Sequence, residues 1–132
     1  MSTSDWSLPP QPVSVPFARS AVRSFLSSVD PQLVSEAAVL VVSELVSNAV
    51  LHARPDPAPI ELHVQADERV VHIEVRDHDP DPPRRRHGVP GPEEDRGRGL
   101  HIVHSVADDW GWDRVEGNGK IVWCDLPPAR SG

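Results

Sequence analysis

The stretch ELVSNAVLHA, residues 44–53, holds the side chains whose types and spacing best suit chemistry. Glu44 and Asn48 are four residues apart, so on a helix they project from neighbouring points of one face, and His52 continues that stripe with some drift. An amide oxygen is a neutral ligand for a metal ion, and a carboxylate can bind a metal ion or accept a proton. The alternative is a helix whose hydrated face carries these polar residues without further role. This stretch alone leaves both interpretations open.

A second candidate lies where a strand ends. Val71, Ile73 and Val75 alternate with polar residues and share one face of the expected strand. The same period of two places Asp77 on that apolar face. A carboxylate there must find hydrogen-bond donors from the backbone, a partner or a ligand. The alternative is that Asp77 only begins a turn.

A third candidate is the sequence RGRGL, residues 96–100. Gly97 and Gly99 precede an expected helix that contains apolar residues at helical spacing. Glycines at a helix start let backbone amides approach an anion, and the helix dipole favours negative charge there. A single pair of glycines before a helix is also common in ordinary loops, so this signal is weak by itself.

Composition limits the function classes. The chain has 132 residues, which fits one domain, and a formal net charge of −7, which argues against a general binder of nucleic acid or acidic membranes. The longest apolar run, Ala37–Val42, is far shorter than the roughly 20 residues of a membrane span. The N-terminus lacks the pattern of a secretion signal. Cys124 is the one cysteine, fits a reducing cytoplasm, and is expected to be a buried, inert thiol.

These candidates need elements to position them. We expect one domain over residues 13–127, between flexible tails at residues 1–12 and 128–132, with a lid loop at residues 78–96 that is rich in proline and charge. Asp30 and Pro31 are expected to begin the longest helix, which at about 1.5 Å per residue would be roughly 35 Å long. The expected order is a strand, two helices, two strands, the lid, a helix and a hairpin. These elements cover residues 13–17, 17–29, 31–53, 60–66, 71–77, 100–107, 110–115 and 120–126.

The order and spacing of these motifs, over residues 13–127, resemble the GHKL ATPase superfamily. Within it, the chain is similar to the stand-alone bacterial anti-sigma-factor serine/threonine kinases of actinobacterial type. The resemblance implies an α/β (α+β) two-layer sandwich of the Bergerat ATP-binding type. In that fold a mixed, mostly antiparallel sheet is covered on one face by helices.

The resemblance also implies roles for single residues. Asn48 matches the asparagine that holds the Mg²⁺ ion bridging the ATP phosphates. Glu44 matches the acid that acts as general base toward the protein hydroxyl receiving the γ-phosphate. Asp77 matches the aspartate that accepts a hydrogen bond from the adenine amino group. The implied ligands are therefore ATP and Mg²⁺.

The phosphates would be held by the second glycine box. Gly97, Gly99 and the backbone amide of Leu100 match that box, and Arg96 and Arg98 would add positive charge beside it.

The chain departs from the family at two places. The first glycine box usually reads aspartate-x-glycine-x-glycine, whereas this chain has Asp77-His78-Asp79-Pro80-Asp81, with neither glycine. In the closing strand Ile121 follows Lys120 where relatives often have a hydroxyl residue near adenine, so one polar contact to the base would be missing.

The first functional hypothesis is a cytoplasmic kinase that regulates transcription by partner switching. It would bind a sigma factor and phosphorylate an antagonist protein, with no direct contact to nucleic acid or membrane, and a homodimer is compatible with it because relatives commonly dimerise. The alternative is a catalytically inactive module of the same fold that binds nucleotide or protein, which the altered first glycine box favours. A detached ATP-binding part of a histidine kinase is a weaker fit, because no phospho-acceptor helix pair precedes the domain.

Overall fold

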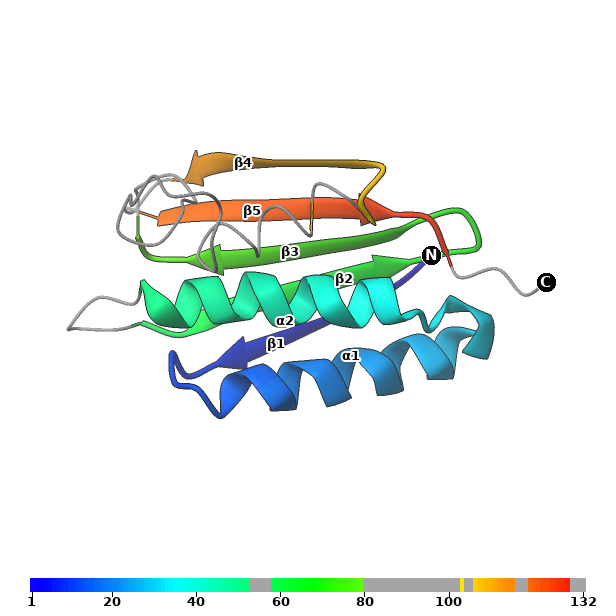
Figure 1. Ribbon diagram of the computed structural model, residues 1–132, viewed down its shortest axis with the longest axis horizontal. Coiled ribbons are helices and arrows are strands. Elements are labelled where there is room, and N and C mark those ends of the chain that lie inside the picture. The colour runs from blue at the N-terminus through cyan, green and yellow to red at the C-terminus, as the bar shows by residue number, and fades with distance from the viewer. Residues whose placement is uncertain (53–57, 80–102, 104–105, 116–118, 129–132) are drawn as a thin grey trace.

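Two helices cover one face of an antiparallel sheet in the computed structural model of this chain (Figure 1). The structure describes residues 1–52, 58–79, 103, 106–115 and 119–128. Within them the sheet has five strands in the order β1-β2-β3-β5-β4, and each neighbouring pair is antiparallel. This confirms the predicted two-layer sandwich, with antiparallel pairing throughout these five strands rather than a mixed sheet. The elements are β1 (Ser2–Leu8), α1 (Ser14–Val29), the 3-10 turn η1 (Pro31–Leu33), α2 (Glu36–Leu51), β2 (Ile60–Ala66), β3 (Val71–Asp77), β4 (Asp109–Val115) and β5 (Gly119–Leu126).

The core lies between the sheet and the helices. Alternate residues of β2, β3 and β5 face the helices, because cross-strand partners in an antiparallel sheet share a face. One such row joins Leu62, Val75 and Val122, all buried. Cys124 lies in the next row and is fully buried, and this burial raises the pKa of its thiol to about 12. The predicted burial of this thiol is confirmed, and the raised pKa disfavours the thiolate, which is the nucleophilic form.

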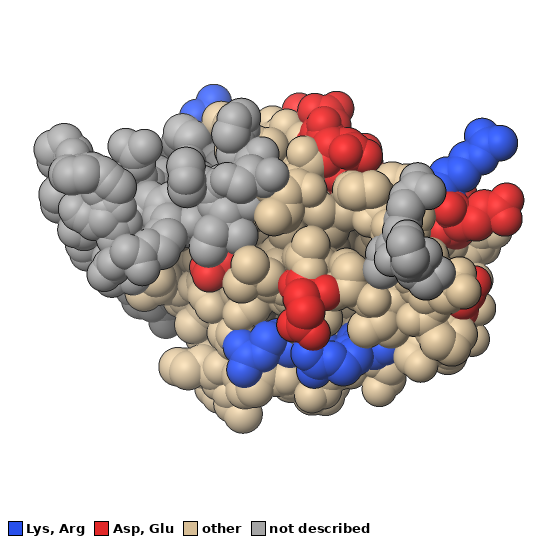
Figure 2. Space-filling view, turned by 45° about the vertical axis from the view of Figure 1, so that its right-hand side comes forward, with Lys and Arg blue, Asp and Glu red and all other residues tan. Residues whose placement is uncertain are grey.

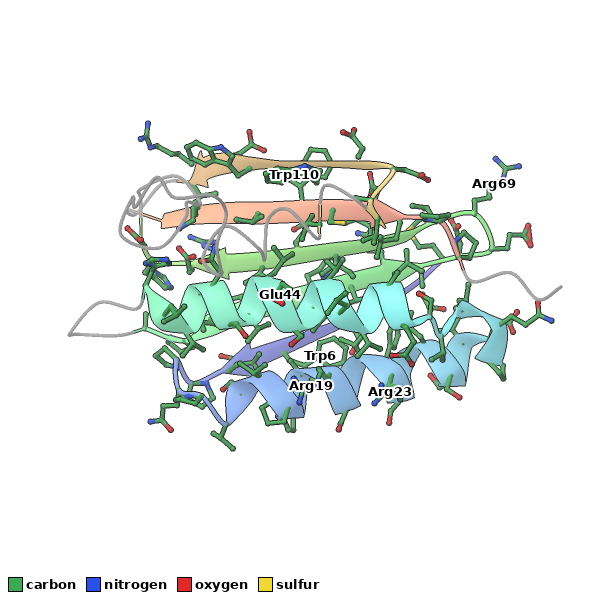
Figure 3. The ribbon with its side chains drawn as sticks, viewed as in Figure 1. Trp6, Arg19, Arg23, Glu44, Arg69 and Trp110 are labelled. Atoms are coloured by element: carbon green, nitrogen blue, oxygen red, sulfur yellow. The ribbon has the colours of Figure 1, made fainter. Side chains whose placement is uncertain are left out.

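The first residues are not the loose tail that their polar composition suggested. Ser2–Leu8 forms β1, the edge strand that pairs along its whole length with β2. Its inward positions carry two apolar anchors, Trp6 and Leu8, and the remaining residues are polar. Trp6 points toward the helical layer and meets Phe25 of α1 edge to face, with ring centroids 6.0 Å apart (Figure 3). Strand pairing and this aromatic contact therefore order a segment that hydrophobic periodicity does not reveal.

The strand expected at residues 13–17 is wrong, because α1 begins at Ser14. Pro16 falls in the first helical turn, where the missing N–H costs nothing. The Ser14 amide bonds to the Gln11 carbonyl at 2.9 Å, and the Ser14 hydroxyl donates to the Pro9 carbonyl. The helix predicted at residues 17–29 is confirmed and extended. Its buried stripe is Ser14, Ala18, Val22 and Leu26, whereas the apolar Phe17 is exposed.

The long helix expected at residues 31–53 is two elements. Asp30 accepts a hydrogen bond from the Gln32 amide and so caps only the short turn η1. The chain is extended at Ser35, whose hydroxyl oxygen accepts from the Ala38 amide at 3.0 Å and caps α2. The 16 residues of α2 make it about 24 Å long, shorter than the predicted helix.

The remaining predictions divide between described and undescribed parts of the chain. The strands expected at residues 60–66, 71–77, 110–115 and 120–126 are confirmed as β2 to β5. Of the predicted lid, residues 80–96 lie outside the described residues, as do residues 129–132 of the C-terminal tail.

The surface carries both signs of charge. Figure 2 shows acidic side chains spread over one face, with a short row of basic side chains along its lower part. Arg19 and Arg23 are the two basic residues of α1, one turn apart (Figure 3). Among the described residues, no helix is long and apolar enough to cross a membrane.

The sheet face that the helices do not cover carries a histidine held between two acids. His72 Nε2 lies 2.7 Å from Glu74 Oε2, and its Nδ1 contacts Asp125 Oδ1. The ring also stacks on the indole of Trp123, with centroids 6.2 Å apart. Burial alone would lower the pKa of His72, but hydrogen bonds to Glu74 and Asp125 outweigh it and raise the pKa above the ordinary value of 6.5.

We therefore expect the free energy of unfolding to fall as pH rises through the raised pKa of His72. The folded state holds this proton more tightly than the unfolded state, so the contribution is complete below about pH 6.5 and is lost above the folded pKa. Urea unfolding between pH 5.5 and about 8.5 measures this slope. His72→Gln should flatten it and Asp125→Asn should reduce it. A His72→Gln protein that keeps the full slope would contradict this assignment.

Candidate functional site

Three chain segments that carry candidate residues meet at one end of the molecule. Figure 1 shows that the carboxyl end of α2, the end of β3 and the start of β5 lie together at the left of that view. Their residues there are Asn48 on α2, Asp77 on β3 and Lys120 on β5. Segments far apart in the sequence thus bring an amide, a carboxylate and an ammonium to the same end of the sheet.

The orientation of α2 separates its polar residues into two sides. Ser43 accepts a hydrogen bond from Arg19 Nη1 at 3.1 Å, so this side of α2 faces α1. At about 100° per residue, Glu44 and Asn48 lie on the side of α2 turned away from α1. Both are half-buried rather than fully hydrated. The predicted pairing of Glu44 with Asn48 on one helical face is confirmed, and Figure 3 shows Glu44 on α2 above α1.

Asp77 occupies the buried end of β3, as the period of two predicted. The residue is 7% exposed and ends the row that contains Val71, Ile73 and Val75. Its carboxylate does find donors. Oδ1 accepts from the Asp79 amide at 2.9 Å, and the ammonium of Lys120 lies 3.1 Å from Oδ2 and 3.2 Å from Oδ1. Donors from backbone and side chain thus satisfy a carboxylate that would be costly to bury alone.

Lys120 is the residue that the sequence did not reveal as part of this site. The register pairs Asp77 with Lys120 and Arg76 with Ile121, so Lys120 faces Asp77 whereas Ile121 lies on the opposite face of the sheet. Lys120 is only 2% exposed. We had expected the base to lack one polar contact because of Ile121. Instead, the residue on the same face as Asp77 is Lys120, so a cation lies beside the expected position of the base. The period of two in β5, counted from buried Val122, could have placed Lys120 inward.

The altered first glycine box adopts a defined conformation at its start. Asp79 stands where the family pattern has its first glycine, and it is 3% exposed. Its amide bonds to the Asp77 carboxylate, and its carbonyl accepts from Lys120 Nζ at 3.1 Å. Its own carboxylate lies 3.9 Å from the same ammonium. Lys120 thus binds the backbone and side chains of the turn that replaces the glycine.

Other candidates are only partly placed. Arg96, Gly97, Arg98, Gly99 and Leu100 lie outside the described residues, so the second glycine box stays a prediction. His52 ends α2 as its C-cap.

The donor set near Asn48 and Asp77 is chemically suited to a nucleotide with Mg²⁺. The described residues contain no group of three or more His, Cys, Asp or Glu that could hold a metal ion. Mg²⁺ in nucleotide sites is commonly bound by one or two protein oxygens together with phosphate oxygens, and the Asn48 amide offers such an oxygen. The Asp77 carboxylate suits an amino group of a base, since it lies at the edge of an apolar layer.

Comparisons with known proteins agree with this architecture. A family model described as a histidine kinase-like ATPase domain matches residues 8–125. The structure of the RsbU and RsbW domains of Rv1364c from Mycobacterium tuberculosis is similar, with a TM-score of 0.72 and 16% identity. The match covers 100% of this chain and 34% of that chain, so this chain spans about a third of its length. A search of curated proteins found no match.

A second similar structure is the mycobacterial sensor histidine kinase MprB. It has a TM-score of 0.53 and 14% identity, and the match covers 97% of this chain and 100% of that chain. At these identities the two structures support the fold alone.

Gly119 holds β5 against the end of β3, so we expect Gly119→Ala to destabilise the protein. A Cβ at residue 119 would lie 2.3 Å from the Asp77 carbonyl oxygen, and backbone must move to relieve that contact. We expect a loss of roughly 1–3 kcal/mol in the free energy of unfolding, measured by urea titration. Gly111→Ala is the comparison, because its Cβ would lie 2.9 Å from a side-chain atom of Trp123 and not from backbone, so a shift of that side chain alone can relieve the contact. Equal losses in both variants would contradict the view that the backbone contact at residue 119 costs more than the side-chain contact at residue 111.

Proposed function

This chain belongs to the histidine kinase-like ATPase family, and on that premise we propose that it is an ATP-binding serine/threonine protein kinase of the anti-sigma-factor type. The observation that carries the proposal is the placement of Asp77. Its carboxylate is buried at the end of β3, at the same end of the sheet as the carboxyl end of α2. Asn48 lies near that end of α2, and Glu44 lies one turn before it. A nucleotide whose base contacts Asp77 and whose phosphates lie toward α2 would bring Asp77, Glu44 and Asn48 into one site.

Each residue has a distinct proposed task. Asp77 accepts a hydrogen bond from the exocyclic amino group of adenine, and Asn48 supplies an oxygen to Mg²⁺. Asn48 would hold the Mg²⁺ ion, which when bound would neutralise negative charge on the phosphates. Glu44 accepts the proton of the serine or threonine hydroxyl that attacks the γ-phosphorus, while ADP leaves. Arg96, Gly97, Arg98, Gly99 and Leu100 hold the phosphates.

We place this kinase in a partner-switching system in the cytoplasm. The ATP-bound protein holds a sigma factor, and it phosphorylates a serine or threonine of a small antagonist protein. The phosphorylated antagonist no longer sequesters it. The anti-sigma resemblance of the sequence supports this role, and the likeness to a structure with an RsbW domain is compatible with it.

A binding module without catalysis is the second candidate. The observation that favours it is the Lys120 contact to Asp77 together with Asp79 at a glycine position. A base must bind beside an ammonium that already contacts both carboxylate oxygens. Such a site could retain nucleotide, or only its protein contacts, while losing transfer.

We expect nucleotide binding that depends on Mg²⁺ and on Asn48. Isothermal calorimetry with ATP and ADP, with and without Mg²⁺, measures it directly. Asn48→Ala should remove the Mg²⁺-dependent gain, at a cost of roughly tenfold or more in affinity, and Asp77→Asn should weaken binding by roughly 10- to 100-fold. Gln32→Ala is the control, since Gln32 is an exposed amide in η1. ATP binding that is unchanged in both site variants would refute the assigned roles.

We expect transfer of the γ-phosphate to a co-encoded antagonist protein to require Glu44. Loss of a general base typically lowers a rate by about 10²- to 10⁴-fold, so Glu44→Ala and Glu44→Gln should both fall in this range while ATP still binds. The assay follows radiolabelled phosphate from ATP to the antagonist. Glu68→Ala, an exposed acid in the β2–β3 turn, is the control. Normal transfer by Glu44→Ala would refute the base, and nucleotide binding without transfer by the wild type would favour the binding module.

A further inference from the structure

Among the described residues, no helix covers the sheet face turned away from α1 and α2, which we call the outer sheet face (Figure 1). The strand register shows which residues share it, because cross-strand partners in an antiparallel sheet point the same way. Asp125 of β5 is level with His72 of β3. Two residues earlier on β5, Trp123 is level with Glu74 of β3 and Gly111 of β4. The central three strands of this face thus carry aromatic and acidic side chains together.

An aromatic strip, formed by Trp123 and His72, crosses the outer sheet face. The two rings are stacked, with centroids 6.2 Å apart and planes 25° apart. The indole also lies across Gly111, where a Cβ would be 2.9 Å from a ring carbon. Trp123 is half-buried, so part of its ring stays exposed to solvent. The strip offers an aromatic surface that the core of the protein does not use.

Two carboxylates border the aromatic strip. His72 Nε2 lies 2.7 Å from Glu74 Oε2, and His72 Nδ1 contacts Asp125 Oδ1. A carboxylate has about four lone-pair sites on its two oxygens. With respect to the described residues, Glu74 Oε1 and Asp125 Oδ2 therefore keep acceptor sites. The two side chains are 34% and 33% exposed, so a ligand can reach both.

The sign of charge on the outer sheet face selects the kind of partner. The charged side chains that its strands carry are almost all carboxylates: Asp5, Glu61, Glu74, Asp109, Asp113 and Asp125, against the single guanidinium of Arg76. Two such faces would repel each other, so this face does not suit a second copy of the chain. Nucleic acid is disfavoured for the same reason. Charge complementarity favours a cationic partner.

Arginine fits this surface better than lysine does. A guanidinium is planar, stacks on aromatic rings and can donate to two carboxylate oxygens at once, whereas an ammonium is a compact and strongly hydrated charge. The aromatic strip supplies the surface for stacking. Glu74 and Asp125 supply the acceptors at its border.

We propose that the outer sheet face docks a basic segment of a partner protein, with an arginine side chain stacked on the aromatic strip and hydrogen-bonded to Glu74 and Asp125. Asp77 lies in the row of β3 that faces the helices, on the opposite side of the sheet. The docking surface is therefore separate from the proposed nucleotide site, and either can fail while the other stands.

The test is an NMR titration of the ¹⁵N-labelled wild-type protein with hexa-arginine and, separately, with hexa-lysine, both peptides blocked at their termini. We expect the indole N–H of Trp123 and backbone amides of β3 and β5 to shift saturably with hexa-arginine, with a dissociation constant below about 1 mM. Hexa-lysine should bind at least about threefold more weakly, because it cannot stack or donate in the same way.

Variants separate the aromatic contribution from the charge. Trp123→Leu should weaken hexa-arginine binding by about three- to tenfold and remove its advantage over hexa-lysine. Glu74→Gln and Asp125→Asn should each weaken it by about threefold. The control is Glu36→Gln, which makes the same charge change at an exposed acid in the first turn of α2. It should leave the affinity nearly unchanged at about 0.15 M salt.

Several outcomes would overturn the docking surface. One is the lack of saturable shifts up to about 1 mM hexa-arginine. Equal affinity for the two peptides, or a loss in Glu36→Gln as large as in Glu74→Gln, would reduce the binding to general charge attraction. Shifts confined to α1 and α2 would place the peptide elsewhere. Shifts of the outer sheet face on raising the protein concentration alone would assign this face to a second copy of the chain instead.

Discussion

The end of β3 is organised by one electrostatic constraint, the burial of Asp77 next to Lys120. A carboxylate that is 7% exposed needs donors, and the register between β3 and β5 supplies one by pairing these two residues. The turn after β3 supplies the second through the Asp79 amide. The close approach of Gly119 to the Asp77 carbonyl belongs to the same arrangement, since a side chain there would push the strands apart. The strand register and the turn after β3 thus together position the residues of the candidate site.

The two-layer architecture explains why buried polar groups gather at this end of the molecule. The sheet buries its apolar face against α1 and α2, and the core rows run the length of β2, β3 and β5. At the end of those rows the apolar residues give way to Asp77 and Lys120, beside the carboxyl end of α2. Polar groups that would destabilise the centre of the core are tolerated where the layers end, because they satisfy one another there.

Strong periodic signals made most of the fold predictable. Alternation in β2 and β3 placed Asp77 on the buried face, and helical spacing placed Glu44 with Asn48. β1 was missed because its inward positions include serines, so Trp6 and Leu8 alone mark the strand. The break before α2 was missed because Asp30 and Pro31 resemble the start of a helix. They begin the short turn η1, whereas Ser35 caps α2. Lys120 was missed because a lysine is seldom expected in a core row. The period of two in β5 places Lys120 inward, but its burial as an ammonium depends on the tertiary ion pair with Asp77, which single-sequence patterns do not encode.

The most direct test of this account is a crystal structure with Mg²⁺ and a non-hydrolysable ATP analogue. We expect the adenine amino group within hydrogen-bond distance of the Asp77 carboxylate, and Mg²⁺ about 2.1 Å from the Asn48 side-chain oxygen. Such a complex would establish that Asp77, Lys120 and α2 form one nucleotide site. Analogue density elsewhere on the protein, with the Asp77–Lys120 pair untouched, would contradict the account and assign that pair a purely structural role.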